Sequence, residues 1–183
     1  MAPVSLRTMA DAYDFLLTLE LRDDLTEDEI AELRWHLGLG PRPGRLSLIP
    51  DFPREMLDEN GEPVRDERGE IALEDFPLLA QRAAAHRIGG AAVSALARRE
   101  GPRPGWALTT RQSLHPDDFD GVDQLVDWLA SRADPEYYGS RQHRVDGTPG
   151  PAGCGQFVGY QRFYEEEGVV ELVIRDGRIA RAA

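Results

Sequence analysis

The sequence has 183 residues, about the size of one domain, and its 41% hydrophobic and 30% charged content is typical of a globular protein. All 21 basic residues are arginines, which excludes sites that need a lysine, such as P-loops, Schiff-base enzymes and protein kinases. The single cysteine, Cys154, excludes intrachain disulfides and cysteine-rich zinc or iron–sulfur sites. We therefore expect no cofactor and no metal centre. No motif decides whether the chain is an enzyme.

The net charge of −12 is unevenly distributed along the chain. Residues 51–80 carry a net charge of −7 and residues 112–136 carry −6, whereas residues 81–111 carry +5. An acidic protein is repelled by phosphate backbones and by anionic lipid, so we expect no nucleic acid and no membrane as partners. Residues 1–14 lack the apolar core of a signal peptide, and no apolar run approaches the roughly 18 residues of a membrane span. With one free cysteine, the sequence predicts a cytoplasmic protein.

The first half of the chain begins with a predicted strand and a predicted helix. Apolar and polar residues alternate over residues 15–22, which is typical of a strand. Thr26 and Glu29 have the spacing of a capping box, so a helix is expected to begin there and to end at Gly38. Residues 39–80 break the pattern, with a small hairpin expected around residues 66–69. Residues 76–87 are rich in alanine and are predicted to form a short helix.

The second half repeats the strand and helix pattern. Residues 89–99 and 105–114 flank a loop with two prolines that a helix could not cross, so we expect a hairpin of two strands. Pro116 suits the first position of a helix, and apolar residues continue at helical spacing from Phe119 to Leu129. Residues 133–155 are predicted to be a loop, followed by strands at about 157–164 and 169–176.

The predicted order is strand, helix, strand, strand, helix, strand, strand, and its first six elements give the ferredoxin-like βαββαβ arrangement. A faint repeat with a shift of 89 residues, which aligns Leu19 with Leu108 and Arg22 with Arg111, favours this pseudo-twofold fold. We therefore expect one α+β domain over residues 1–183, with an antiparallel sheet and an extra fifth strand in the order 5-4-1-3-2. Two long loop insertions are expected at about 39–88 and 133–155.

The period of two in the strands predicts which side chains lie on the face away from the helices. In the first strand these are Thr18, Glu20 and Arg22, and in the third strand Thr109, Arg111 and Ser113. The fourth strand is apolar or aromatic on both sides, so both faces of the sheet are expected to be covered there. The candidate ligand-binding residues are Glu20, Arg111, Tyr160, Arg162 and Tyr164 on this face, with His143 from the loop at 137–144.

Two functions from different classes fit this pattern. Arg111 and Arg162 flank the first strand and suit a carboxylate or phosphate, with Glu20 neutralising one of them. One hypothesis is therefore a small-molecule-binding protein or a cofactor-independent enzyme that holds a small anionic or polar ligand with the sheet face and the loop at 137–144. An alternative for the same residues is a buried ion pair with hydrogen-bonded tyrosines that only stabilises the fold. The other function is that of a non-enzymatic acidic interaction or inhibitor protein, which would bind a basic protein partner through the acids of residues 51–80 and 112–136.

Other residues bear on assembly and on possible catalytic or metal chemistry. Trp35 is predicted to point away from the apolar stripe of its helix and to be covered by the 39–80 insertion or by a second subunit. The strand at 169–174 is predicted to be an unpaired edge, so a homodimer is expected. The histidine and acids of residues 115–120 indicate a helix N-terminus rather than metal ligands. Cys154 has no base nearby in the sequence, and catalysis with His143 stays an open alternative.

Overall fold

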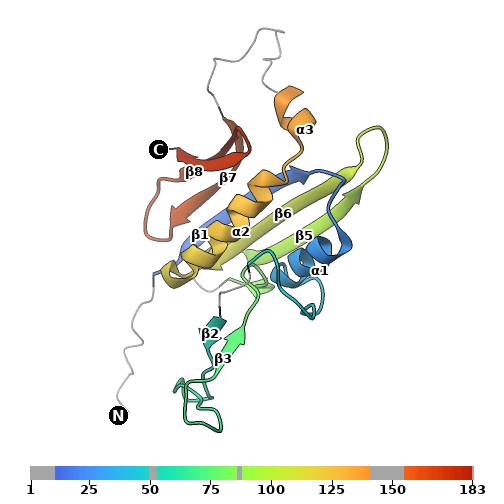
Figure 1. The fold of residues 1–183 in the computed structure, drawn as a ribbon. Coiled ribbons are helices and arrows are strands. Elements are labelled where there is room, and N and C mark those ends of the chain that lie inside the picture. Colours follow the sequence, from blue (N-terminus) through green and yellow to red (C-terminus); the bar gives the residue numbers. More distant parts are fainter. Residues whose placement is uncertain (1–10, 50–52, 86–87, 141–154, 183) are drawn as a thin grey trace.

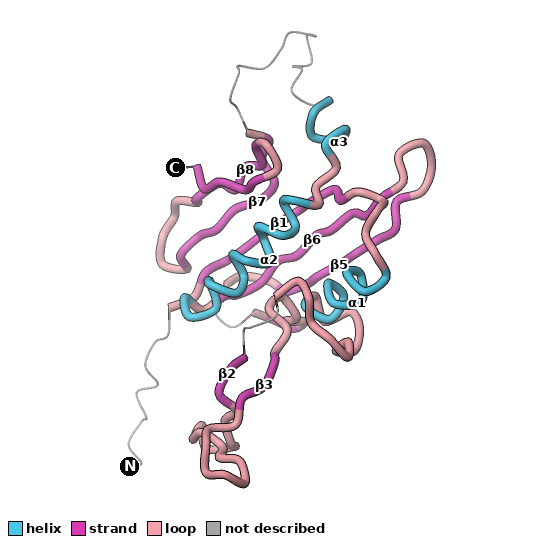
Figure 2. Tube along the Cα trace, in the orientation of Figure 1, coloured by secondary structure: helices cyan, strands magenta, loops and turns pink. Residues whose placement is uncertain are grey.

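The computed structural model describes residues 11–49, 53–85, 88–140 and 155–182, and its central feature is a seven-stranded antiparallel sheet (Figure 1). The strands of this sheet are β1 (Tyr13–Leu21), β4 (Ala83–Ala84), β5 (Ala91–Arg99), β6 (Gly105–Leu114), β7 (Gln156–Phe163), β8 (Val170–Arg175) and β9 (Arg178–Ala182). The helices are α1 (Glu27–His36), the short 3-10 helix η1 (Pro116–Asp118), α2 (Phe119–Ser131) and α3 (Pro135–Ser140). A separate pair of strands, β2 (Pro53–Glu55) and β3 (Leu73–Asp75), projects away from the sheet (Figure 2).

The strand order is β4-β5-β6-β1-β7-β8-β9, so an α+β protein with a large antiparallel sheet is confirmed. The five predicted strands are β1, β5, β6, β7 and β8, and they lie in the predicted order. The sheet has seven strands rather than five because β4 and β9 extend it at its two edges. β9 follows a tight turn in which Asp176 and Gly177 have φ values of 50° and 71°, the geometry of a two-residue hairpin. β8 therefore pairs with β9, and the prediction that residues 169–174 form an edge is wrong.

The main core lies between one face of the sheet and the helices α1 and α2 (Figure 1). Alternate residues of β1 point into it, and Leu17 and Leu21 are completely buried. Leu125 and Leu129 of α2 and Leu33 of α1 are also completely buried, at the spacing of an apolar helix stripe. The predicted register of the first strand is thus confirmed, since its apolar set faces the helices.

Helix α1 begins and ends as predicted. The Thr26 hydroxyl accepts a hydrogen bond from the Glu29 amide, and the Glu29 carboxylate accepts one from the Thr26 amide at 2.8 Å. Gly38 has a φ of 64°, and a Cβ there would lie 3.0 Å from atoms of Ala80, so both the turn and the close approach require glycine. Trp35 is only 7% exposed, so its side chain is covered within the chain and needs no second subunit to bury it.

The predicted helix at 76–87 is not formed in its described part, residues 76–85. Leu78 and Leu79 are buried, and the Leu79 amide donates to the His36 carbonyl at 2.8 Å. The Gln81 amide donates to the side chain of Gln112 at 3.0 Å, and Ala83 then pairs with β5. These contacts with distant residues hold the segment extended, so the helix propensity of its alanines does not decide its structure.

The predicted loop at 133–155 contains helix α3 in its described part. Asp134 accepts hydrogen bonds from the amides of Glu136 and Tyr137 at 3.0 and 3.2 Å, and Pro135 occupies the first helical position.

None of the helices in the described part of the chain is long and apolar enough to cross a membrane.

Candidate ligand site on the uncovered sheet face

The face of the sheet opposite α1 and α2 carries exposed side chains along its middle. Thr18 of β1, Thr109 of β6 and Ala95 of β5 are exposed, and Val93 of β5 is 48% exposed. Thr18 pairs with Thr109, and Thr109 pairs with Ala95, so these side chains form a row across three strands. We call the surface that carries this row the open face.

A cluster of charged residues lies at one end of the open face, and its centre is Asp14 of β1. The Arg111 guanidinium donates two hydrogen bonds to the Asp14 carboxylate, from Nε to Oδ1 at 3.0 Å and from Nη2 to Oδ2 at 2.8 Å. The Tyr160 hydroxyl lies 3.3 Å and Arg162 Nη2 lies 3.5 Å from Asp14 Oδ2. Arg111 and Tyr160 are both register partners of Leu16, and Arg162 is the register partner of Asp14. The antiparallel register of three adjacent strands thus places three polar side chains around one carboxylate.

The two arginines of this cluster are held differently. Arg111 is fixed by its two bonds to Asp14 and by a third, from Nη1 to the Gly89 carbonyl, at 2.7 Å. The hydrogen bonds and charge of Asp14 raise the pKa of the Arg111 guanidinium above its usual range. Among the described residues, Arg162 makes only the long 3.5 Å contact, and its side chain is 32% exposed. One carboxylate and two guanidinium groups leave the cluster with a net positive charge, and Arg162 carries the less satisfied part of it.

Three of the predicted site residues are therefore brought together, and the others are not. Arg111, Tyr160 and Arg162 converge as expected, but their acidic partner is Asp14 and not Glu20. Glu20 lies six residues further along β1, about 20 Å away at roughly 3.4 Å per residue. Tyr164 follows β7, and its hydroxyl donates to Glu165 at 2.7 Å. His143 and Cys154 lie outside the described residues, so their predicted roles stay predictions.

Asp14 was missed although a simple signal pointed to it. The predicted first strand begins at residue 15, two residues after the observed start of β1 at Tyr13. Asp14 has the same parity as Thr18 and Glu20 and therefore lies on the open face. Its position beside two arginine-bearing strands makes it the acid that pairs them.

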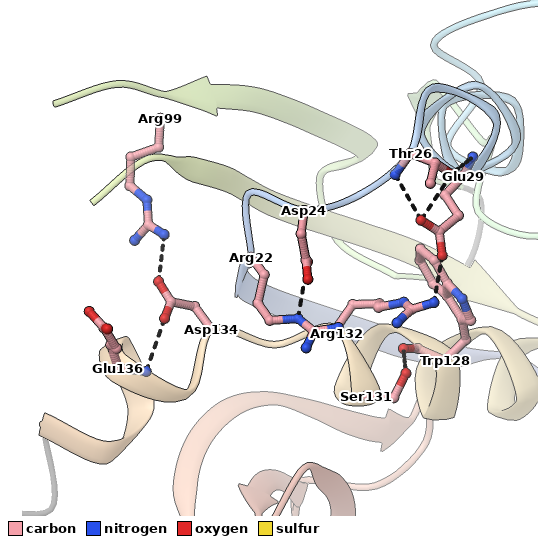
Figure 3. A network of polar contacts seen from close by, with 10 residues as sticks. All are labelled: Arg22, Asp24, Thr26, Glu29, Arg99, Trp128, Ser131, Arg132, Asp134 and Glu136. Carbon is pink, nitrogen blue, oxygen red and sulfur yellow. Dashed lines mark hydrogen bonds and ion pairs between the residues drawn. The ribbon is translucent and has the colours of Figure 1, made fainter. Parts of the chain in front are cut away.

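Glu20 belongs to a second polar network at the other end of β1, part of which is drawn in Figure 3. Arg99 Nη1 lies 3.2 Å from Glu20 Oε2, and Arg99 Nη2 lies 2.7 Å from Asp134 Oδ2. Burial alone would raise the pKa of Asp134, but the hydrogen bonds from Arg99 and from the α3 amides lower it below its ordinary value. The Tyr138 hydroxyl accepts from the Glu20 amide at 2.8 Å. These contacts tie α3 to the ends of β1 and β5, which is a structural role.

A buried acid and a buried histidine lie on α1. The Glu32 carboxylate is 1% exposed and accepts hydrogen bonds from the amides of Ser47, Leu48 and Ile49 at 2.6, 2.8 and 3.3 Å. His36 Nε2 lies 3.8 Å from Glu32 Oε1, and burial lowers the pKa of His36 to about 4, against the opposing effect of the Glu32 charge. The imidazole is therefore neutral at pH 7. Glu32 anchors residues 47–49 to the helix.

The acids and the histidine that open the second helical unit form a helix N-terminus, as predicted. His115 Nδ1 accepts from the Asp117 amide at 3.2 Å, and Asp118 forms an ion pair with Arg54 of β2. Within residues 11–49, 53–85, 88–140 and 155–182, no three His, Cys, Asp or Glu side chains come close enough to hold a metal ion.

Comparison with models of protein families, with curated proteins and with solved structures finds no match for this chain.

Proposed function

We propose that this protein binds a small anionic molecule at the cluster of Asp14, Arg111, Tyr160 and Arg162 on the open face. The observation that carries the proposal is that two arginines share one buried carboxylate. A structural ion pair needs one arginine for one acid, so the second guanidinium is an excess cation. Arginine presents a planar fork of donors that matches a carboxylate or a phosphate group.

The chemistry of the cluster favours one arrangement of the ligand. Arg162, the more weakly held arginine, would turn its free donors toward the anion. Tyr160 would add a hydroxyl donor and an aromatic wall beside it. Asp14 would keep Arg111 in place and would neutralise one of the two guanidinium charges, which leaves one positive charge for the ligand. The exposed threonines of the open face offer hydroxyl groups to the rest of a polar ligand.

The test is a thermal unfolding series with inorganic phosphate and with citrate, on the native protein and on two arginine variants. Arg162→Gln removes the excess charge from the cluster. Arg181→Gln is the matched control, because Arg181 is also paired with one acid, Asp123, at 2.6 Å, but contacts α2 instead of the open face. The proposal expects an anion-dependent rise in Tm that survives Arg181→Gln and disappears in Arg162→Gln. An equal rise in all three proteins, or no rise in the native protein, would show that the cluster is only structural.

The sequence also predicts a ferredoxin-like fold, a cytoplasmic location and a homodimer. The order β7-β1-β6-β5, with α1 and α2 on one face, supports a ferredoxin-like core that β4, β8 and β9 extend. A cytoplasmic location and a homodimer stay predictions. Trp35 and β8 no longer favour the homodimer, and the exposed row on the open face is the surface through which it would form.

A further inference from the structure

The segment that contains β2 and β3, residues 53–75, projects from the body of the molecule, and we call it the arm (Figure 1). Its sequence contains two related stretches, Asp58-Glu59-Asn60-Gly61-Glu62 and Asp66-Glu67-Arg68-Gly69-Glu70. Each stretch forms the same tight turn, in which the aspartate carboxylate accepts from the amides two and four residues later. Gly61 and Gly69 occupy equivalent positions with φ values of 83° and 81°.

The arm is organised around a ring of three backbone hydrogen bonds. The Met56 amide donates to the Ala72 carbonyl, the Ala72 amide to the Val64 carbonyl, and the Val64 amide to the Met56 carbonyl, each at 2.8 Å. These three residues are spaced by eight in the sequence, so three short ladders radiate from the ring. The ladders pair Glu55 with Leu73, Leu57 with Pro63, and Arg65 with Ile71.

The ladders place three exposed apolar side chains of the arm on one side of the ring, together with Glu55 and Arg65, whereas Met56 lies on the other side. Residues on either side of a ring position share one face because strand side chains alternate, and paired residues of antiparallel strands also share one face. Leu57, Ile71 and Leu73 therefore lie on the same side, and they are 55%, 37% and 60% exposed. We call this surface the apolar arm face. Exposed apolar side chains gathered on a small projecting element are typical of a protein–protein contact.

A groove of about 430 Å3 joins the arm to the start of the second helical unit. Leu57 and Glu55 line it from the arm, and His115 and Asp117 line it from the body. Arg54 and Asp118 also line this groove, and Arg54 fixes the base of the arm there through its ion pair with Asp118 and through its guanidinium, which lies 3.6 Å from the centroid of the Phe76 ring. The groove therefore combines an apolar side chain with carboxylates, and its one guanidinium is already paired with Asp118.

The charge of the arm selects the kind of partner. Residues 53–75 contain nine acids and three arginines. Among the described residues, Glu59, Glu62, Glu67 and Glu70 at the two turns are exposed and form no ion pair. A second copy of this chain would bring two strongly negative arms together, and a nucleic acid would be repelled in the same way. A basic surface is attracted to the arm and neutralises it.

We propose that the arm docks a basic segment of a partner protein, with apolar side chains against the apolar arm face and arginine or lysine side chains at the turn glutamates and in the groove. This interaction is independent of the anion site, since it uses none of its residues. The apolar contact supplies the area removed from water, and the acids give the partner its orientation and charge specificity.

The experiment measures binding of fluorescein-labelled peptides to the full chain by fluorescence anisotropy. The probe peptide repeats leucine, arginine and serine, and the comparison peptide replaces each arginine with glutamate. The charge variant carries Glu59→Gln, Glu62→Gln, Glu67→Gln and Glu70→Gln. Its matched control carries Glu100→Gln, Asp127→Asn, Glu166→Gln and Glu167→Gln, which change the net charge equally at exposed positions away from the arm.

A second pair of variants tests the apolar contact. Leu57→Ser with Leu73→Ser removes the most exposed side chains of the apolar arm face, and Val169→Ser with Val170→Ser removes exposed side chains elsewhere. We expect the basic peptide to bind and the acidic peptide not to bind. We also expect the charge variant and the Leu57→Ser, Leu73→Ser variant each to raise the Kd for the basic peptide about tenfold or more, and both controls to keep a Kd close to that of the native protein. If the charge control bound the basic peptide as weakly as the charge variant, net charge alone would explain the binding. If the arm variants bound the peptide as tightly as the native protein, the contact would lie elsewhere on the chain. Either result overturns the proposal.

Discussion

Asp14 and Arg111 lie on adjacent strands and are joined by two hydrogen bonds of 3.0 and 2.8 Å, although the acid is 2% exposed and the arginine side chain is 24% exposed. Asp14 thus forms the inner end and Arg111 the outer end of the pair. A second arginine, Arg162, reaches the same carboxylate from the other side. The buried acid therefore determines where two cations meet on the open face.

Asp14→Asn tests this arrangement, because it preserves the shape of the side chain and removes its charge. We expect the free energy of unfolding to fall by about 2 kcal/mol, since Arg111 and Arg162 lose their shared partner and repel each other. Urea denaturation measures this change. The rise in Tm with inorganic phosphate should become larger than in the native protein, because the net charge of the cluster increases.

Asp123→Asn is the control for Asp14→Asn, because Asp123 is the partner of the exposed Arg181. An exposed ion pair contributes about 1 kcal/mol or less. If the two variants were destabilised equally, Asp14 would not be the centre of the cluster.

The order of the five predicted strands could be derived from the sequence because β1 and β6 have a clear period of two and the apolar spacing of the two helices places them between the strands. β5 and β6 were found from the proline-containing loop between them, and α1 from the capping box at Thr26 and Glu29. These signals act over a few residues, so they do not depend on how the chain packs elsewhere.

The missed features depend on contacts between distant parts of the chain. β4 has two residues and forms because Gln112 and Ala92 hold the segment against β5 and β6. Asp14 was left out because the predicted strand begins at residue 15, two residues after β1 begins at Tyr13, so the alternation of side chains was not extended to it.

Glu32→Gln is predicted to loosen residues 47–49. A glutamine side chain offers one acceptor oxygen where the carboxylate accepts from three amides, and its own N–H groups would face those donors. We expect a loss of about 2 kcal/mol in the free energy of unfolding and faster hydrogen exchange at the Leu48 and Ile49 amides. Glu27→Gln, at an exposed position of the same helix, should cost about 0.5 kcal/mol and leave those amides protected. Unchanged exchange in Glu32→Gln would contradict the anchoring role.

His36 predicts a specific dependence of stability on pH. Its pKa falls from 6.5 to about 4 on folding because burial disfavours the imidazolium. Between these two values the unfolded chain binds the proton more readily, so stability is complete above pH 6.5 and is lost as the pH falls toward 4. The loss is about 3 kcal/mol for a shift of this size.

The variant His36→Leu isolates this contribution, since leucine is apolar and does not titrate. Guanidinium denaturation between pH 7 and pH 4 should give a smaller decline for His36→Leu than for the native protein. The carboxylates with lowered pKa, such as Asp134, lose their contribution at lower pH and affect both proteins alike. Parallel pH profiles would show that His36 is not the buried neutral group described above.

Gly159 of β7 is predicted to be irreplaceable, because β7 passes so close to β1 that a side chain has no room. A Cβ at this position would overlap the carbonyl oxygen of Leu16 and would lie 3.0 Å from the Cα of Leu17. Gly159 also follows the bulge at which the pairing of β7 with β8 shifts, so the strand cannot easily move away. Since Leu16 is the register partner of both Arg111 and Tyr160, a displaced β7 would also separate the residues of the anion site.

We expect Gly159→Ala to lower the free energy of unfolding by about 3 kcal/mol and to abolish stabilisation by inorganic phosphate. Gly168→Ala is the matched control, because nothing lies within 4 Å of a Cβ there, and its stability should stay within about 0.5 kcal/mol of native. Thermal unfolding with and without phosphate measures both effects, and a Gly159→Ala protein as stable as Gly168→Ala would refute the close approach of β7 to β1.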